Sequence, residues 1–328
     1  MISMELYEYV KETYPNICQI SASRDGEVFC RETWNGYSFA NKVHAASVTK
    51  SIIGLLIGIA IEKRLIESEN AKVLDFFSNY SIKRGERTIQ EITLHHLLTM
   101  TAPYKFKSEP WTKVCTSENW TKEVLDLLGG RKGLTGDFKY STLGIQILSA
   151  IITKVSQMPT IEFANKYLFE PLGIERRQSI SVHSKEEHIE FVTSKSPKKA
   201  VWYCDSSGIA SAGFGLCLSA DEMLKIGQMC LDKGIYGYKR VVSAEWIERM
   251  LSPKVSCGEK FGYMKYGYLW WIVDEEKQIF SAIGDGGNII YINGAKNIVV
   301  SITSTFKPLV FDRIEFIQKH IEPLAGVQ

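Results

Sequence analysis

The sequence feature that most constrains this chain is a run of apolar residues that follows a serine and a lysine. Residues 44–61 read HAASVTKSIIGLLIGIAI, with Ser47 and Lys50 three positions apart. Side chains three positions apart share one face of a helix, so a helix that begins here brings Lys50 beside Ser47. The residues that follow are apolar on every side, which predicts a helix surrounded by protein. A membrane span is disfavoured, because the run is about half of the roughly 20 residues required and Glu62-Lys63-Arg64 ends it.

This pairing has a chemical meaning. A serine hydroxyl is a weak nucleophile and needs a neighbouring base. A lysine amine serves as that base where burial or a nearby positive potential lowers its pKa toward neutrality, and the first turn of a buried helix supplies both. We therefore interpret Ser47 as a nucleophile and Lys50 as its base. The alternative is that Ser47 only caps a core helix.

The same Ser-x-x-Lys spacing occurs twice more in the chain. Ser196 and Lys199 lie in a polar, lysine-rich segment, and Ser304 and Lys307 lie at the end of a predicted strand. Neither match opens an apolar helix. Context therefore favours Ser47.

The composition excludes several classes of protein. The chain has 328 residues, which suits one large domain or two closely joined ones, and its 39 Lys and Arg nearly balance 37 Asp and Glu, which disfavours a nucleic-acid partner. Seven scattered cysteines without a Cys-x-x-Cys pair disfavour a disulfide framework or a zinc site. The first residues lack the basic and apolar regions of a secretion signal, so we expect a cytoplasmic protein.

The adjacent histidines His95 and His96 are candidate metal ligands. Neighbouring residues on a helix point about 100° apart, and no carboxylate cluster accompanies this pair. We expect neither a metal nor another cofactor.

The order of patterns along the chain predicts an α+β fold. Helical spacing covers residues 3–13, and two alternating segments flank Arg24-Asp25-Gly26, which predicts a hairpin. Strand patterns recur near the C-terminus, before a helix at 308–320, at residues 266–273, 278–283, 288–292 and 297–304. The polar segment 176–202 is interpreted as loop with mixed structure.

These elements suggest a central antiparallel sheet built from both chain ends and flanked by helices. Residues 1–78 and 210–328 are expected to form this sheet domain. Residues 79–209 are expected to form a mostly helical inserted domain, with the active site between the two.

Three separated motifs bear on function: Ser47-Val-Thr-Lys50, Tyr140-Ser-Thr142 and Gly284-Asp-Gly-Gly-Asn288. Together with LHHLLTM at 94–100 and AGFGLCLSADEM at 212–223, they resemble the serine beta-lactamase and penicillin-binding protein superfamily. The resemblance covers nearly the whole chain. It is strongest to the branch that includes class C beta-lactamases, D-alanyl-D-alanine carboxypeptidases and esterases, and it implies a beta-lactamase/transpeptidase-like fold.

The resemblance also implies roles for the motif residues. Ser47 would be the acylated nucleophile, Lys50 its base, and Tyr140 the group that passes protons to the leaving group and activates the deacylating water. A lowered pKa of Tyr140, caused by a nearby lysine ammonium, would suit that work. The alternative for Tyr140 is an aromatic residue that merely packs at a helix end.

The third motif has two possible functions. Glycines at Gly286 and Gly287 would let this edge approach the substrate, and the N–H groups of Asn288 and Ser47 would form an oxyanion hole. The alternative is a tight entry to a hairpin.

Two positions depart from the superfamily pattern. Thr142 stands where asparagine is usual, which removes an amide that can both donate and accept. Asp285 stands where lysine or histidine is usual, and a carboxylate there would repel the carboxylate of a penicillin or a peptide C-terminus. Neutral or cationic acyl groups are therefore the expected substrates.

The leading hypothesis is a serine hydrolase that cleaves an ester or amide through an acyl-enzyme on Ser47. One alternative is a true beta-lactamase or penicillin-binding protein, and another is a non-catalytic ligand-binding or sensor protein on the same fold. The expected partner is a small-molecule ester, amide or beta-lactam, without nucleic acid or a membrane span, and the oligomeric state stays open. Trp111 and Trp202 could either line the pocket or only pack.

Overall fold

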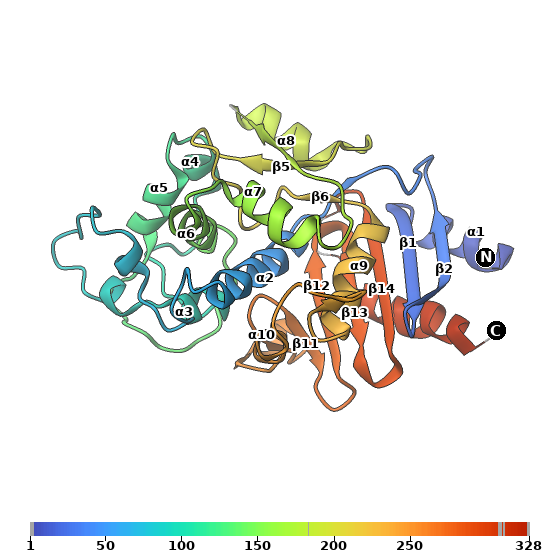
Figure 1. The fold of residues 1–328 in the computed structure, drawn as a ribbon. Coiled ribbons are helices and arrows are strands. Elements are labelled where there is room, and N and C mark those ends of the chain that lie inside the picture. Colours follow the sequence, from blue (N-terminus) through green and yellow to red (C-terminus); the bar gives the residue numbers. More distant parts are fainter. Residues whose placement is uncertain (1–2, 183, 308–309, 311, 327–328) are drawn as a thin grey trace.

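The computed structural model describes residues 3–182, 184–307, 310 and 312–326. Its central feature is an eight-stranded antiparallel sheet with the order β2-β1-β14-β13-β12-β11-β10-β9 (Figure 1). The strands come from both chain ends: β1 (Ile17–Arg24), β2 (Glu27–Thr33), β9 (Val255–Ser256), β10 (Lys265–Tyr266), β11 (Trp271–Asp274), β12 (Ile279–Gly284), β13 (Asn288–Asn293) and β14 (Ile298–Ser304).

Helices cover both faces of this sheet, as the alternation of its side chains requires. On one face, Ile20, Ile289 and Val300 pack with residues of α1 (Met4–Thr13) and of the C-terminal helices. Those C-terminal helices are α11 (Arg313–Phe316), the π-helix η7 (Ile317–Ile321) and the 3₁₀-helix η8 (Glu322–Gly326). The opposite face contacts α9 (Ala220–Leu231) and α2 (Val48–Glu62). The two ends of the chain lie together beside β1 and β2 (Figure 1).

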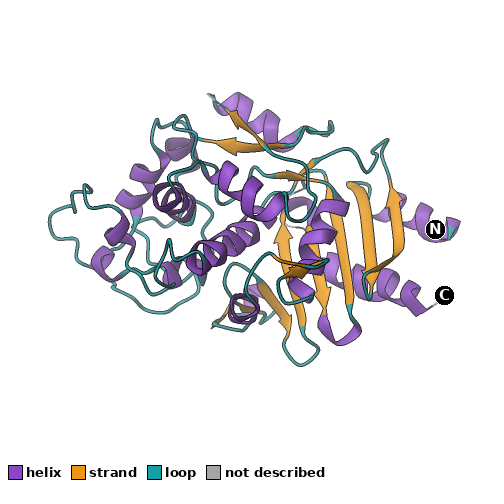
Figure 2. Cartoon of the chain, viewed as in Figure 1, coloured by secondary structure: helices purple, strands orange, loops and turns teal. Residues whose placement is uncertain are grey.

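Most other helices gather at the far end of the molecule, away from the strands (Figure 2). The helix α2 joins the two parts, because it contacts α6 as well as β12. The remaining helices are η1 (Val73–Phe76), η2 (Thr88–Glu91), α3 (Leu94–Leu98), α4 (Trp111–Cys115), α5 (Trp120–Leu127), α6 (Gln146–Ser156), α7 (Thr160–Ala164), η3 (Asn165–Phe169), α8 (Lys185–Thr193), α10 (Ala244–Met250), η4 (Glu259–Phe261), η5 (Asp285–Gly287) and η6 (Gly294–Lys296).

Three two-stranded ladders complete the fold. They pair β3 (Val43–His44) with β6 (Cys217–Leu218), β4 (Gln178–Ser181) with β5 (Val201–Cys204), and β7 (Ile235–Tyr236) with β8 (Lys239–Arg240). The β4–β5 pair is parallel, and α8 lies between its strands in the sequence. The segment 176–202, predicted as loop with mixed structure, therefore contains a regular strand–helix–strand unit.

The predicted fold class is confirmed: a large antiparallel sheet from both chain ends, flanked by helices. The hairpin at residues 24–26 is present, with positive φ at both Asp25 and Gly26, as a tight right-twisting turn requires. The prediction of one continuous strand at residues 266–273 was wrong. The chain turns between β10 and β11, where Leu269 has a φ of 60°. Residues 308, 309 and 311 of the predicted terminal helix lie outside the described residues, and its later part is present as α11 and η7.

Candidate active site

Ser47 lies at the N-terminal end of α2, directly after the short β3–β6 ladder. Ala46, the residue before it, adopts a left-handed φ of 48°, which is uncommon for a residue with a Cβ atom. Ser47 holds the N-cap position, but its side chain makes no capping hydrogen bond. The residue is partly exposed and its hydroxyl interacts with Lys50 instead, so helix capping does not account for this side chain.

Lys50 is buried one turn into α2, with only 1% of its surface exposed. Its Nζ lies 2.7 Å from Ser47 Oγ and donates to the carbonyl oxygen of Gly213 at 2.8 Å. Burial lowers the pKa of Lys50 to about 7, against the opposing charges of Glu109 and Asp285. A neutral amine keeps a lone pair for the serine proton while one N–H still bonds Gly213. The geometry and the pKa both suit a base.

Tyr140 lies beside this pair, with Lys50 Nζ 4.9 Å from the centre of its ring. The ring stacks on Trp271 at 5.8 Å and is partly exposed. Burial raises the pKa of Tyr140, and its hydrogen bond with Ser47 opposes that shift only in part. The expectation of a lowered phenol pKa was therefore wrong, and Tyr140 is a protonated donor at neutral pH.

A carboxylate that the motifs did not predict holds the second motif in place. Glu109 Oε1 accepts hydrogen bonds from Ser141 Oγ at 2.6 Å, Thr142 N at 2.8 Å and Leu143 N at 2.9 Å. Thr142 also packs against Gly213, where a Cβ atom would lie 2.4 Å from the threonine methyl. Glu109 lies in a segment without a motif, so only the fold could reveal this contact.

The third motif is held in place by hydrogen bonds to residues other than Ser47. Gly286 and Gly287 have positive φ values of 84° and 85°, and Gly286 N donates to Lys307 O at 2.8 Å. Asn288 is buried, and its side chain bonds the backbone of Asp285 and Ser304.

The glycine that faces the nucleophile is Gly284. A Cβ atom there would lie 2.5 Å from Ala45 O and 2.9 Å from Ser47 N. The exposed residue Asp285 follows it, close enough for its charge to act on Lys50 and Tyr140. Gly284 is part of the third sequence motif, but the sequence prediction assigned the close approach to Gly286 and Gly287 instead.

The other candidate residues have local partners. His96 Nδ1 lies 2.9 Å from Thr93 Oγ1, and His95 Nδ1 lies 3.2 Å from the Tyr268 hydroxyl. Trp202 is fully buried and donates to Ser211 O, so it packs. Trp111 is partly exposed and contacts the ring of Phe214 at 5.3 Å, next to the Gly213 carbonyl that binds Lys50.

The described residues contain neither a metal-ligand cluster nor a membrane-spanning helix. No group of three or more His, Cys, Asp or Glu side chains there is arranged to hold a metal ion. No helix of that part of the chain has the length and apolar character needed to cross a membrane.

Comparison with known proteins agrees with this geometry. The family model described as Beta-lactamase matches residues 20–320. The chain belongs to the Beta-lactamase family. It is therefore a serine hydrolase of the beta-lactamase-like type, and the superfamily resemblance seen in the sequence is confirmed.

Relatives within the superfamily are distant. A 6-aminohexanoate-dimer hydrolase from Paenarthrobacter ureafaciens is 24% identical over 304 residues, which cover 86% of this chain and 71% of that protein. The octameric penicillin-binding protein homologue from Pyrococcus abyssi has a TM-score of 0.74 at 23% identity, over 98% of this chain and 76% of that one. A class C beta-lactamase from Rhodobacter sphaeroides has a TM-score of 0.69 at 16% identity, over 98% of both chains.

Proposed function

We propose that this protein hydrolyses an ester or amide through an acyl-enzyme on Ser47. The observation that carries the proposal is the buried Lys50 amine, 2.7 Å from the Ser47 hydroxyl, with a pKa of about 7. The site would lie between a sheet domain of residues 1–78 and 210–328, which supplies Ser47 and Asp285, and a helical domain of residues 79–209, which supplies Tyr140.

Each group has a defined task in this scheme. Lys50 accepts the proton from Ser47 Oγ as that oxygen bonds to the acyl carbon. Tyr140 donates its proton to the leaving amine or alkoxide and regains one from the Lys50 ammonium. Water then attacks the acyl-enzyme and loses a proton along the same path, which restores Ser47.

The oxyanion would form beside the start of α2. The N–H of Ser47 is one donor, and the sequence prediction places the second at Asn288, with Gly286 and Gly287 shaping the turn. The contact of Gly284 with Ser47 N supports a role for the β12 edge here. In other enzymes the loss of one such donor costs about 3 kcal/mol.

The nucleophile is tested with a p-nitrophenyl acetate burst assay and intact-protein mass spectrometry. We expect a burst of nitrophenol and a covalent acetyl adduct in the wild type, and neither in Ser47→Ala. Ser304→Ala is the matched control, because it removes the serine of another Ser-x-x-Lys match. Turnover of the ester by Ser47→Ala at the wild-type rate would refute the assignment.

Asp285 supports a preference for substrates without a negative charge. Its carboxylate is exposed beside the catalytic groups, and Glu109 adds a second negative charge near Lys50. An amide with a free ammonium group would be favoured, and the relative named as a 6-aminohexanoate-dimer hydrolase is consistent with this class.

The charge preference is tested with nitrophenyl esters of matched size that carry an ammonium, a neutral or a carboxylate group. We expect Asp285→Asn to raise kcat/KM for the carboxylate ester, and lower it for the ammonium ester, by about fivefold each, because a nearby but partly screened charge is removed. The neutral ester is the internal control. An equal change for all three esters would contradict charge selection.

Two alternatives have decisive tests. Nitrocefin turnover comparable to the ester rate would make beta-lactams the substrate, whereas a stable penicilloyl adduct would indicate a penicillin-binding protein. Absence of labelling by a fluorophosphonate or a penicillin probe would favour a non-catalytic binding or sensor protein. A cytoplasmic location is also proposed, because all seven cysteines are free thiols.

A further inference from the structure

A large cavity lies in the helical part of the molecule. It has a volume of about 1180 Å³ and is lined by residues of the segments 83–88, 101–107 and 129–139. Ser47, Lys50 and Tyr140 are not among its lining residues. Small-molecule sites typically measure about 300–1,000 Å³, so this cavity is large enough for a substantial ligand.

The cavity has a strong excess of positive charge. Eight Lys and Arg residues line it against three Asp and Glu residues, an excess of five. The whole chain has an excess of only two, with 39 against 37. A random sample of this surface would be close to neutral, so the cations are concentrated here. We call this cavity, centred on Lys105, Arg131, Lys132 and Lys139, the basic pocket.

Only part of this charge is neutralised by the protein. Lys105 Nζ lies 3.1 Å from Glu86, and Lys83 Nζ lies 3.2 Å from Asp126. Within the described residues, Arg131, Lys132 and Lys139 make no ion pair with a carboxylate. Arg84, Arg87 and Lys107 also line the cavity without such a partner there, so several cations are available to a ligand.

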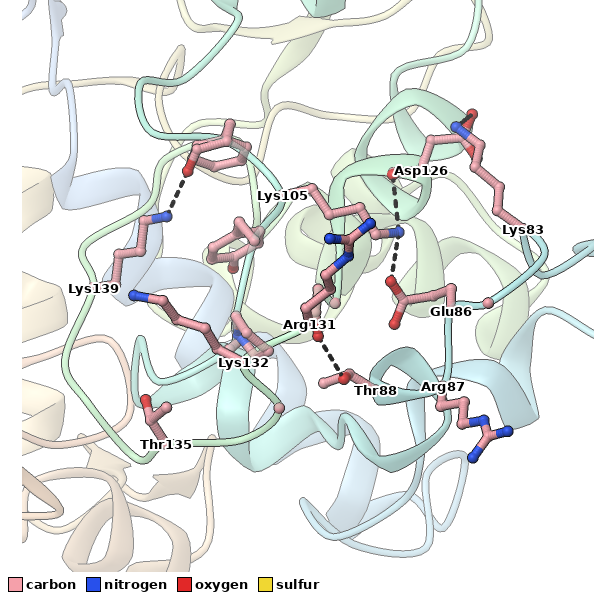
Figure 3. A pocket seen from close by; sticks show the side chains of 18 of the residues that line it. Lys83, Glu86, Arg87, Thr88, Lys105, Asp126, Arg131, Lys132, Thr135 and Lys139 are labelled. Atoms are coloured by element: carbon pink, nitrogen blue, oxygen red, sulfur yellow. Dashed lines mark hydrogen bonds and ion pairs between the residues drawn. The ribbon is translucent and has the colours of Figure 1, made fainter.

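Two of the three cations Arg131, Lys132 and Lys139 lie close together. Figure 3 shows the Lys132 and Lys139 side chains side by side and the Arg131 side chain extending toward Lys105. Lys139 is held by a 2.8 Å hydrogen bond from its Nζ to Phe106 O, over the Phe106 ring. Lys132 is close enough to act on Lys139 by like-charge repulsion. A bound anion would relieve that repulsion.

The chemistry of these groups favours phosphate over a single carboxylate. Arginine presents a planar fork that binds phosphate oxygens in pairs, and lysine adds a point charge. Several unneutralised cations around one cavity match a ligand with several negative charges. We propose that the basic pocket is a binding site for a small molecule that carries a polyphosphate group.

The pocket also adjoins the second catalytic motif. Lys139 precedes Tyr140 in the sequence, and its backbone N–H donates to Met100 O at 2.7 Å. Tyr104 lines the pocket with its ring, while its hydroxyl abuts Gly144, just beyond Thr142. A ligand here would therefore rest against the elements that position Tyr140.

The proposal is tested by isothermal titration of the full chain with sodium tripolyphosphate and with ATP in 150 mM salt. We expect saturable one-to-one binding to the wild type. Arg131→Gln/Lys132→Gln should weaken it about tenfold or more, because two charge-assisted contacts are lost. The control Lys195→Gln/Lys239→Gln removes the same charge at exposed positions outside the pocket and should change binding less than twofold.

Several outcomes would overturn the proposal: no saturable binding to the wild type, equal weakening in both double variants, or binding only to a twelve-nucleotide uridine RNA or to phosphatidylglycerol vesicles. A second measurement needs no variant. Acetylation of lysines, followed by mass spectrometry, should show that tripolyphosphate protects Lys132 but not Lys195 or Lys239. Equal protection of all three, or of none, would also refute it.

Discussion

At the scale of single residues, the protonation state of Lys50 decides what the site can do. Burial removes water from the ammonium and lowers its pKa to about 7. The negative charges of Glu109 and Asp285 keep this pKa from falling further. The amine is therefore about half neutral at pH 7. A lysine in water would be almost fully charged there and could not accept a proton from Ser47.

This balance predicts the pH dependence of acylation. The rate of the nitrophenyl ester burst should rise with pH through about 7, as Lys50 loses its proton. Because Asp285 raises the pKa of Lys50, Asp285→Asn should move the rise to lower pH. Asp25→Asn, at the distant hairpin, removes the same charge and should leave the profile unchanged. A flat profile from pH 5 to 9 in the wild type would rule out Lys50 as the base.

Sequence reasoning succeeded at this scale where the contact is local. Ser47 and Lys50 are one helical turn apart, so the spacing alone placed them together. Glu109 was not predictable in the same way, because it is 32 to 34 residues from the groups that it binds and carries no motif. The direction of the Tyr140 pKa was also missed, since burial of the ring outweighs the nearby groups.

At the scale of elements, the end of β12 presses against the start of α2. Gly284 has φ of −130°, which any residue can adopt, so its need for glycine is steric rather than conformational. Its neighbours are the backbone atoms Ala45 O and Ser47 N, which cannot rotate away as a side chain could.

Gly284→Ala is therefore expected to push β12 away from Ser47. The ester burst rate should fall at least about 100-fold, as expected when an oxyanion donor is misplaced. Gly326→Ala is the control, because its added methyl group meets no atom within 4 Å. Circular dichroism separates this effect from unfolding. A folded Gly284→Ala protein with the wild-type burst rate would show that this contact does not shape the site.

Helices and strands were predictable from the sequence where the residue types at neighbouring positions specify a turn or a helix cap. The hairpin at Asp25 and Gly26 forms as expected. Ser219 and Glu222 form a capping box, which is the structure that the spacing Ser-x-x-Glu before an apolar helix predicts. The break between β10 and β11 was not foreseen, because its cause lies elsewhere in the chain. A Cβ atom on Gly267 would lie 2.2 Å from Met250 O, so α10 fixes the path of this turn.

At the scale of the whole molecule, a buried ion network joins segments that are distant in the sequence. Glu222 on α9 binds Arg177 at 2.5 Å and Lys42 at 3.2 Å. The Arg177 side chain has no exposed surface, and its Nε also donates to Cys217 O on β6. The network thus ties the start of the β4–α8–β5 unit to α9 and to the β3–β6 ladder that leads to Ser47. No local pattern predicts such a cluster.

Removal of the negative charge of Glu222 should leave the positive charges of Arg177 and Lys42 buried without compensation. We expect Glu222→Gln to lower the free energy of unfolding by about 3–5 kcal/mol at pH 7, measured by urea denaturation. Glu245→Gln is the matched control: its side chain is 80% exposed, so it should change stability by less than about 0.5 kcal/mol. Equal effects of the two variants would show that the network does not stabilise the fold.

The difference in free energy of unfolding between the wild type and Glu222→Gln should also depend on pH, which gives an independent check on the role of the Glu222 charge. Burial alone would raise the pKa of Glu222, but Arg177, the Ser219 N–H and Lys42 together outweigh burial and lower it. A carboxylate with a lowered pKa stabilises the fold above the pKa of the unfolded chain, about 4.3, and loses that contribution as pH falls through its folded value. The stability gap between the wild type and Glu222→Gln should therefore be largest near neutral pH and shrink in acid. A gap that stays constant down to pH 3 would mean that shape, rather than charge, makes Glu222 necessary.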